Sequence, residues 1–211
     1  CRTLLNNLDQ KIKTAFILNP RFSDLQLLQM IVADLGISGE FKNKFALINA
    51  LNEFLIRETS IGNNVVLIID EAQNLGVSQL EQIRLLSNLE TEKQKLLQII
   101  LIGQPELDQY LKLPELRQLN QRVTVLYHIP PLDQKELENY IHHRLKIASA
   151  QIQNKYKVYF TDKAIDAVYQ HSYGTPRMVN ILFDRALLAG FVAETYTIDE
   201  SIIHQCAQEV L

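Results

Sequence analysis

The chain has 211 residues, of which 47% are apolar and 21% are charged. This composition is typical of a globular protein with a substantial core, and it argues against a disordered or fibrous chain. A formal net charge of −3 gives no overall attraction to nucleic-acid phosphates or to anionic membranes.

The first 131 residues alternate aliphatic runs with amphipathic segments. Capping signals at Ser23 and Ser78, with Gln26 and Glu81 three residues later, predict two helices, and a third is expected from about Lys44. Short apolar runs that end at turn residues or proline predict strands over 14–18, 65–69, 97–102 and 123–129. Strands alternating with helices predict a parallel α/β sheet with right-handed crossovers.

The pattern changes after Pro131, where the remaining signals are helical. Helices are expected to start at Asp133, Thr161, Pro176 and Asp199. We therefore expect an α/β core over 1–131 and a small all-helical lid subdomain over 132–211.

The segment VVLIIDEAQN places two adjacent carboxylates directly after an aliphatic strand. In open α/β sheets, ligands bind beyond the carboxyl ends of the strands. The pair resembles a Walker B motif, in which one acid holds the Mg²⁺ that bridges nucleotide phosphates and the other polarises the attacking water. Asp70 fits the first role and Glu71 the second. The alternative is that both residues only end the strand and start a loop.

A second candidate site residue lies in the helical part, in Gly174-Thr175-Pro176-Arg177. The glycine and the proline mark a helix start, which places Arg177 in the first turn. Basic residues are better placed at helix C-termini, so an arginine there indicates a bound anion. The alternative is an ion pair between Arg177 and Asp184 or another acid.

Four phrases follow one another along the chain: DEAQ, IGQPEL, PELRQLNQRV and GTPR. Together with ILNPR near Asn19 and EQIRLLSNLET over 81–91, they make nearly the whole chain similar to AAA+ ATPases of the general secretion pathway protein A family. The resemblance implies a P-loop NTPase sheet with a helical lid, and ATP and Mg²⁺ as cofactors. ATPases that accompany pilus assembly and exosortase-linked polysaccharide export are very similar, and the sequence does not choose among these systems.

The resemblance also implies roles for further side chains. Gln104 stands where these proteins have sensor 1, which contacts the attacking water or the γ-phosphate, and Arg177 stands where they have sensor 2. Arg122, ahead of Arg117, stands where an arginine finger reaches the nucleotide of a neighbouring subunit. An ordinary loop glutamine and surface ion pairs are the alternatives.

No GxxxxGK[ST] motif occurs in the chain, so the loop that cradles the β and γ phosphates is absent from it. The family places that loop, with the first and central strand of the sheet, directly before the segment that begins here with Cys1-Arg2. We therefore expect a truncated ATPase that is inactive alone. The strands at 97–102 and 123–129, which would flank the absent strand, are expected to stay apart, to pair directly, or to accept a strand from another chain.

By resemblance, the parent protein is a homo-oligomer that works with secretion or envelope-assembly proteins, and many relatives add a membrane segment and a peptidoglycan-binding domain. The resemblance thus implies a cytoplasmic module whose parent is anchored in the inner membrane. The two cysteines, Cys1 and Cys206, lack CxxC spacing, which favours a reducing compartment. No apolar run reaches the roughly 20 residues that cross a bilayer, so no membrane segment is expected in this chain.

Two other functions remain open. A DNA-handling AAA+ protein of the initiator or transposition-regulator type shares the acids and the lid arginine, but the acidic net charge speaks against it. A nucleotide-independent docking module would keep the fold and not the chemistry.

The adjacent His142 and His143 point about 100° apart on a helix, so they are not expected to share a metal ion.

Overall fold

The computed structural model describes residues 7–9, 11–91, 94–150 and 158–210. The expectations for Cys1-Arg2 therefore lie outside the described residues. The chain divides into two compact units, Cys1–Leu126 and Tyr127–Leu211. Among the described residues, no helix combines the length and the apolar character needed to cross a bilayer.

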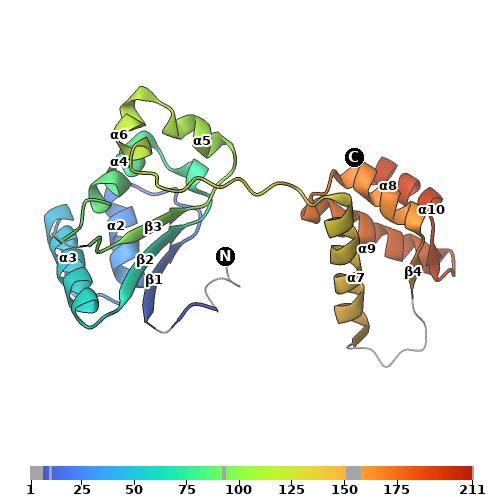
Figure 1. The fold of residues 1–211 in the computed structure, drawn as a ribbon, viewed down its shortest axis with the longest axis horizontal. Coiled ribbons are helices and arrows are strands. Elements are labelled where there is room, and N and C mark those ends of the chain that lie inside the picture. The colour runs from blue at the N-terminus through green and yellow to red at the C-terminus, as the bar shows by residue number, and fades with distance from the viewer. Residues whose placement is uncertain (1–6, 10, 92–93, 151–157, 211) are drawn as a thin grey trace. The chain divides into compact units, whose positions relative to one another are not determined.

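The first unit contains a three-stranded parallel sheet with the strand order β1-β2-β3 (Figure 1). β1 (Ile12–Ile17) pairs with β2 (Asn64–Ile69), which also pairs with β3 (Gln98–Leu101). The last residues of the three strands are aligned with one another, so all three strands end at one edge of the sheet. The expected parallel α/β sheet is confirmed, with β2 in its middle.

In the first unit, α2 and α3 begin at polar N-cap side chains, Ser23 and Asn43. α2 starts with the predicted capping box, in which the Ser23 side chain accepts from the Gln26 N–H at 3.3 Å and Gln26 Oε1 accepts from the Ser23 N–H at 2.9 Å. The predicted cap at Ser78 is wrong, because Gly76 is the N-cap of α4 and the Ser78 hydroxyl donates to Asp24 instead. The helical elements are α2 (Asp24–Asp34), α3 (Lys44–Ser60), η1 (Ala72–Asn74), α4 (Val77–Leu86), α5 (Glu106–Leu111), η2 (Pro114–Leu116) and α6 (Arg117–Asn120).

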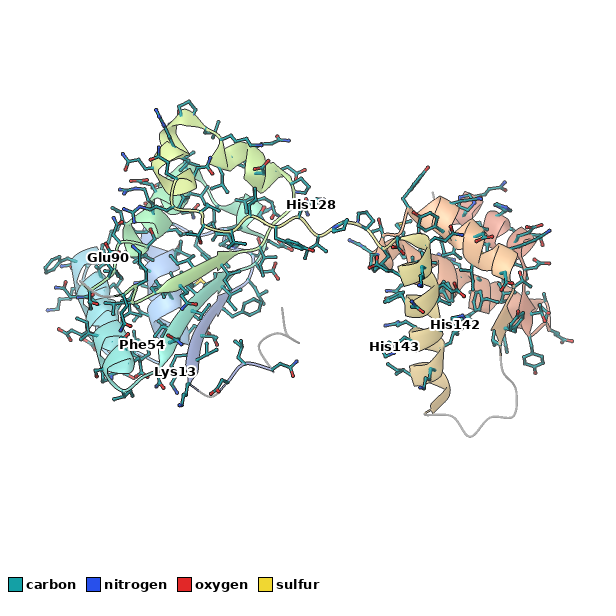
Figure 2. The ribbon with its side chains drawn as sticks, in the orientation of Figure 1. Lys13, Phe54, Glu90, His128, His142 and His143 are labelled. Atoms are coloured by element: carbon teal, nitrogen blue, oxygen red, sulfur yellow. The ribbon has the colours of Figure 1, made fainter. Side chains whose placement is uncertain are left out.

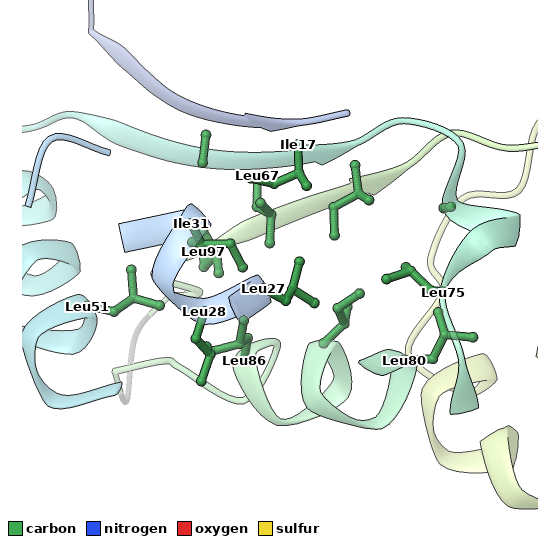
Figure 3. Packing of buried hydrophobic residues seen from close by; sticks show 14 of the residues in the cluster. Ile17, Leu27, Leu28, Ile31, Leu51, Leu67, Leu75, Leu80, Leu86 and Leu97 are labelled. Carbon is green, nitrogen blue, oxygen red and sulfur yellow. The ribbon is translucent and has the colours of Figure 1, made fainter. Parts of the chain in front are cut away.

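The core of this unit lies between the sheet and helices α2 to α4 (Figure 3). Ile17, Leu67 and Leu97 enter it from the strand side, and Leu27 and Ile31 enter it from α2 (Figure 3). All five side chains are almost completely buried. Burying an aliphatic side chain of this size stabilises the fold by roughly 1.5–3 kcal/mol, so this core fixes the sheet against its helices.

The fourth predicted strand, over 123–129, is absent from the structure. This segment follows α6 without β pairing. Val123 is half-buried, and the other four apolar side chains are 71–79% exposed: Val125, Leu126, Tyr127 and Ile129. Within the described residues, β3 pairs with β2 alone, and Ile100 of β3 is 40% exposed. The two segments that were expected to flank an absent strand therefore do not pair. β-Propensity reflects packing against neighbouring strands, so a β-rich segment without a partner has no ladder to join.

The second unit is mainly helical (Figure 1). Asp133 and Glu136 form the predicted capping box, with N–H···carboxylate distances of 3.0 and 2.7 Å. Thr161 caps the next helix at 3.1 Å, and Asp199 accepts from the Ile202 N–H at 3.1 Å. The four expected helix starts are thus confirmed: α7 (Gln134–Ala150), α8 (Asp162–Ser172), α9 (Pro176–Val192) and α10 (Glu200–Val210).

A two-residue parallel pair, which the sequence did not predict, connects distant parts of this unit. β4 (Tyr159–Phe160) pairs with β5 (Thr197–Ile198). Phe160 is buried and stacks on Phe183 of α9, with 4.2 Å between the ring centroids. The pair therefore ties the chain before α8 to the chain before α10, beside the helical core.

Candidate functional site

Two loops meet at the carboxyl edge of the sheet, one after β2 and one after β3. Backbone pairing continues past the strands, because the Ile102 N–H donates to the Ile69 carbonyl at 2.9 Å and the Ala72 N–H donates to the Ile102 carbonyl at 2.8 Å. On the other side, the Asp70 N–H donates to the Ile17 carbonyl at 2.9 Å. These bonds fix the ends of all three strands relative to one another.

Asp70 and Glu71 lie at this edge, directly after β2. Asp70 is half-buried and its Oδ1 accepts from the Glu71 N–H at 3.0 Å, whereas Glu71 is exposed. Glu71 has a left-handed backbone with φ 53°. That conformation costs a non-glycine residue roughly 1–2 kcal/mol, and such strain is common at functional sites. The two carboxylates thus leave the strand on a strained turn.

One amide group holds the Glu71 carboxylate. Asn74 Nδ2 donates to Glu71 Oε2 at 3.2 Å and to Asn19 Oδ1 at 3.1 Å. Asn19 follows β1 and also has a left-handed backbone, with φ 47°. The contact links the ends of β1 and β2. Neither asparagine was predicted as a site residue, and the only sign in the sequence was that both follow strands.

Gln104 lies at the same edge, in the exposed loop after β3. Its backbone N–H donates to Gln73 Oε1, on the turn after β2, at 3.1 Å. The structure therefore brings the two acidic residues and Gln104 to neighbouring loops of one sheet edge. Sequence reasoning missed Gln73, although it lies within the DEAQ phrase.

The two candidate finger arginines lie around α6. Arg117 begins this helix, Arg122 follows it, and both are exposed. The pKa of Glu90 is lowered mainly by the hydrogen bond and charge of Lys95 and also by the charge of Arg122. Arg122 thus has an acidic residue near it within the same unit.

Arg177 lies in the second unit, exposed in the first turn of α9. Before it, Gly174 has φ +72°, and its carbonyl accepts from the Leu132 N–H at 2.9 Å. A Cβ on Gly174 would overlap the Leu132 carbonyl oxygen, so both the backbone conformation and the close approach require glycine. No ion pair joins Arg177 to Asp184 in the part of the chain that the structure describes.

The donors at the sheet edge suit Mg²⁺ bound together with phosphate. Carboxylate oxygens are hard ligands, and Mg²⁺ usually takes one or two of them and completes its shell with water and phosphate oxygens. Asp70 offers one such carboxylate, and Glu71 follows it in the chain. Across the described residues, no group of three or more His, Cys, Asp or Glu side chains could hold a metal ion without other ligands. Two hollows of the first unit lie elsewhere, one beside Asn64 and Gln98 at the opposite strand ends and one beside Phe41.

Contacts are made by His142, His171 and His204, which all lie in the second unit. His142 and His143 are exposed neighbours on α7, and His142 Nε2 lies 3.7 Å from Glu138 Oε1 (Figure 2). His171 of α8 and His204 of α10 have ring nitrogens 2.9 Å apart. This second pair joins two helices and was not apparent from the sequence.

Comparison with known proteins identifies a family for this chain. A family model described as AAA domain matches residues 1–111. General secretion pathway protein A of Aeromonas hydrophila is 38% identical over 210 residues, which are 99% of this chain. The chain spans 38% of the length of that relative.

Solved structures share the fold at lower identity. ORC2 of Aeropyrum pernix in its ADP form has a TM-score of 0.63 at 13% identity, over 99% of this chain and 55% of that one. Cdc6p of Pyrobaculum aerophilum has a TM-score of 0.68 at 16% identity, over 95% and 54% of the two chains. The Holliday junction branch migration motor RuvB of Thermotoga maritima has a TM-score of 0.52 at 16% identity, over 94% and 61%.

These three likenesses concern the fold alone, and they confirm the expected P-loop NTPase architecture. The AAA domain model covers more than half of the chain, and the 38% identity extends over 99% of it. The chain therefore belongs to the AAA domain family, as a relative of general secretion pathway protein A.

Proposed function

We propose that this chain is part of an ATPase module that binds and hydrolyses ATP with Mg²⁺ in support of a bacterial cell-envelope secretion system. The observation that carries the proposal is the grouping of Asp70, Glu71 and Gln104 on adjoining loops at the carboxyl edge of the sheet. The phosphate-cradling loop belongs, in this proposal, to the segment upstream of Cys1. Hydrolysis is accordingly an activity of the longer protein.

Each of the three residues has a distinct task. When bound, Mg²⁺ would neutralise the charge that develops on the nucleotide phosphates. Asp70 holds that ion, directly or through water. Glu71 polarises the attacking water as a general base, and Gln104 orients the same water from the neighbouring loop. The exposure of Glu71 and the hydrogen bond from Asn74 support this division, because the carboxylate is both accessible and oriented.

The arginines have proposed roles of their own toward phosphate. Arg177 contacts phosphate from the lid subdomain, which we place over 132–211, with the core over 1–131. Its exposure in the first turn of α9 supports this role. Arg122, ahead of Arg117, acts as the finger toward a neighbouring copy in a homo-oligomer, in competition with its own Glu90.

The secretion role rests on the similarity to general secretion pathway protein A. We propose that the module works on the cytoplasmic side, together with envelope-assembly proteins and within a parent anchored in the inner membrane. The solved relatives share only the fold at 13–16% identity, so they add no case for a DNA-handling function.

The test is Mg²⁺-dependent ATP hydrolysis by a chain extended upstream to include the phosphate-binding loop. Replacing Glu71 by Gln removes the general base and keeps its size, so turnover should fall by roughly 10²- to 10⁴-fold while ATP binding persists. Glu53→Gln, on the exposed side of α3, is the matched control and should hydrolyse ATP like the wild type. The present chain, Cys1–Leu211, should show no turnover.

Full activity of the Glu71→Gln variant would rule out the proposed role of Glu71. No turnover in any form, even at high protein concentration, would instead favour the nucleotide-independent docking module.

A further inference from the structure

One side chain connects the turn that carries the acidic residues to the loop that carries Gln104. Gln73 lies in η1, two residues after Glu71, and is half-buried. Its Oε1 accepts the Gln104 backbone N–H at 3.1 Å, across 31 positions of sequence. The bond therefore joins the ends of β2 and β3 beyond the last paired strand residues.

The backbone of the two loops approaches closely enough to make this bond possible. The Ala72 N–H donates to the Ile102 carbonyl at 2.8 Å beside it. A Cβ on Gly103 would lie 2.9 Å from Gln73 Oε1 and 3.2 Å from the Gln73 backbone nitrogen. The absence of a side chain at Gly103 thus leaves room for the Gln73 amide. Two hydrogen bonds thus connect the loops, and only the bond from the Gln104 N–H to Gln73 Oε1 depends on a side chain.

The position of Gln104 is constrained on its other side as well. Its carbonyl accepts from the Leu107 N–H at 2.9 Å, at the start of α5. The backbone of Gln104 is therefore held between η1 and α5. Removing the Gln73 acceptor would free one of these two attachments and leave the other intact.

We propose that Gln73 is a positioning residue that sets the place of Gln104 relative to Glu71. This inference rests on the proposed ATPase function, in which both residues act on one water. Catalysis is sensitive to such placement, since a displacement of about 1 Å can cost about 10²-fold in rate. Because Gln73 acts through the geometry of the water site, its loss lowers kcat and leaves the KM for ATP nearly unchanged.

The test compares three variants in the upstream-extended chain. Gln73→Leu removes the acceptor and should lower kcat by about 10- to 100-fold. Gln73→Glu keeps an acceptor oxygen at the same distance from the backbone and should recover most of that loss. Gln109→Leu makes the same chemical change at an exposed position of α5 and should behave like the wild type. Equal kcat for wild type and Gln73→Leu would overturn the inference.

A double-mutant cycle with Gln104→Leu separates positioning from a general loss of structure. If Gln73 acts through Gln104, the double variant has the kcat of Gln104→Leu alone. The reason is that Gln73→Leu can no longer displace a Gln104 side chain that is already absent. If the double variant instead shows the product of the two single-variant losses in kcat, the inference is overturned.

Amide hydrogen exchange in the present chain gives a readout that needs no turnover. Gln73→Leu should speed exchange of the Gln104 N–H, and Gln109→Leu should not. Unchanged exchange would overturn the positioning role by itself. Inactivity of the extended wild type would instead count against the proposed function, so the two failures are distinguishable.

Discussion

Replacement of Gly174 by alanine should lower the free energy of unfolding of the second unit by more than the cost of a left-handed alanine alone. Gly174 connects α8 to α9, with φ +72°, and its carbonyl accepts from the Leu132 N–H at 2.9 Å. An added Cβ would overlap the Leu132 carbonyl oxygen and lie 3.0 Å from the carbonyl carbon. Because those atoms are backbone, the overlap cannot be relieved by turning a side chain.

The expected magnitude has two parts. A left-handed alanine costs roughly 1–2 kcal/mol, and forcing apart closely packed groups adds about 1–3 kcal/mol. The Gly174→Ala variant should therefore lose roughly 2–5 kcal/mol of unfolding free energy, as the sum of these two ranges. Gly36 has the same φ of +72°, and an added Cβ there would meet nothing within 4 Å, so Gly36→Ala isolates the first part.

The assay is urea unfolding followed by circular dichroism, fitted with one transition for each unit. The transition of the second unit should move in Gly174→Ala by clearly more than that of the first unit moves in Gly36→Ala. Equal losses in the two variants would refute the reasoning, because they would mean that the approach of Leu132 adds nothing to the conformational cost.

Two further predictions concern burial and pH. Leu67→Ala should lower the free energy of unfolding by roughly 2–5 kcal/mol because it leaves a cavity in the core. Leu126→Ala, at a 71% exposed position, should change the free energy of unfolding little. Equal losses in urea unfolding would contradict this prediction. The pKa of Asp199 is lowered by hydrogen bonds from the Ser201 hydroxyl and the Ile202 N–H. Because its pKa is lower in the folded state, Asp199 stabilises the fold at pH values above its unfolded pKa of about 3.9. This contribution is lost as the pH falls through the folded-state pKa. Asp199→Asn keeps a capping oxygen but cannot titrate, so it should lose less stability than wild type on acidification below about pH 4; identical pH profiles would contradict the assignment.

Much of the fold follows from local sequence rules. The capping box of Asp133 and Glu136 appears at the start of α7 as predicted, because both partners lie three residues apart and need no tertiary contact. The aliphatic run of β2 was equally clear, since five consecutive buried residues suit the middle of a parallel sheet. At Ser78 the same rule failed, because its hydroxyl bonds to Asp24 of another helix.

The remaining features depend on contacts that no local pattern contains. The segment 123–129 has strand composition, yet it is exposed and unpaired in the described structure. The left-handed backbone of Glu71 follows from the turn that places Ala72 against the carbonyl of Ile102. The pairing of Gln73 with Gln104 spans 31 positions, so spacing alone could not reveal it.

The middle position of β2 explains why the residues that follow it can organise the whole edge. A loop after an edge strand has one neighbouring strand end within reach, whereas the turn after β2 has two. Asn74 uses one side of this turn to connect Glu71 with Asn19 after β1, and Gln73 uses the other side to hold Gln104 after β3. The acid-bearing turn is thus fixed from both directions by amide side chains, while the Glu71 carboxylate stays exposed. An exposed carboxylate held in this way is oriented before any ligand arrives, which suits the general-base role proposed for Glu71.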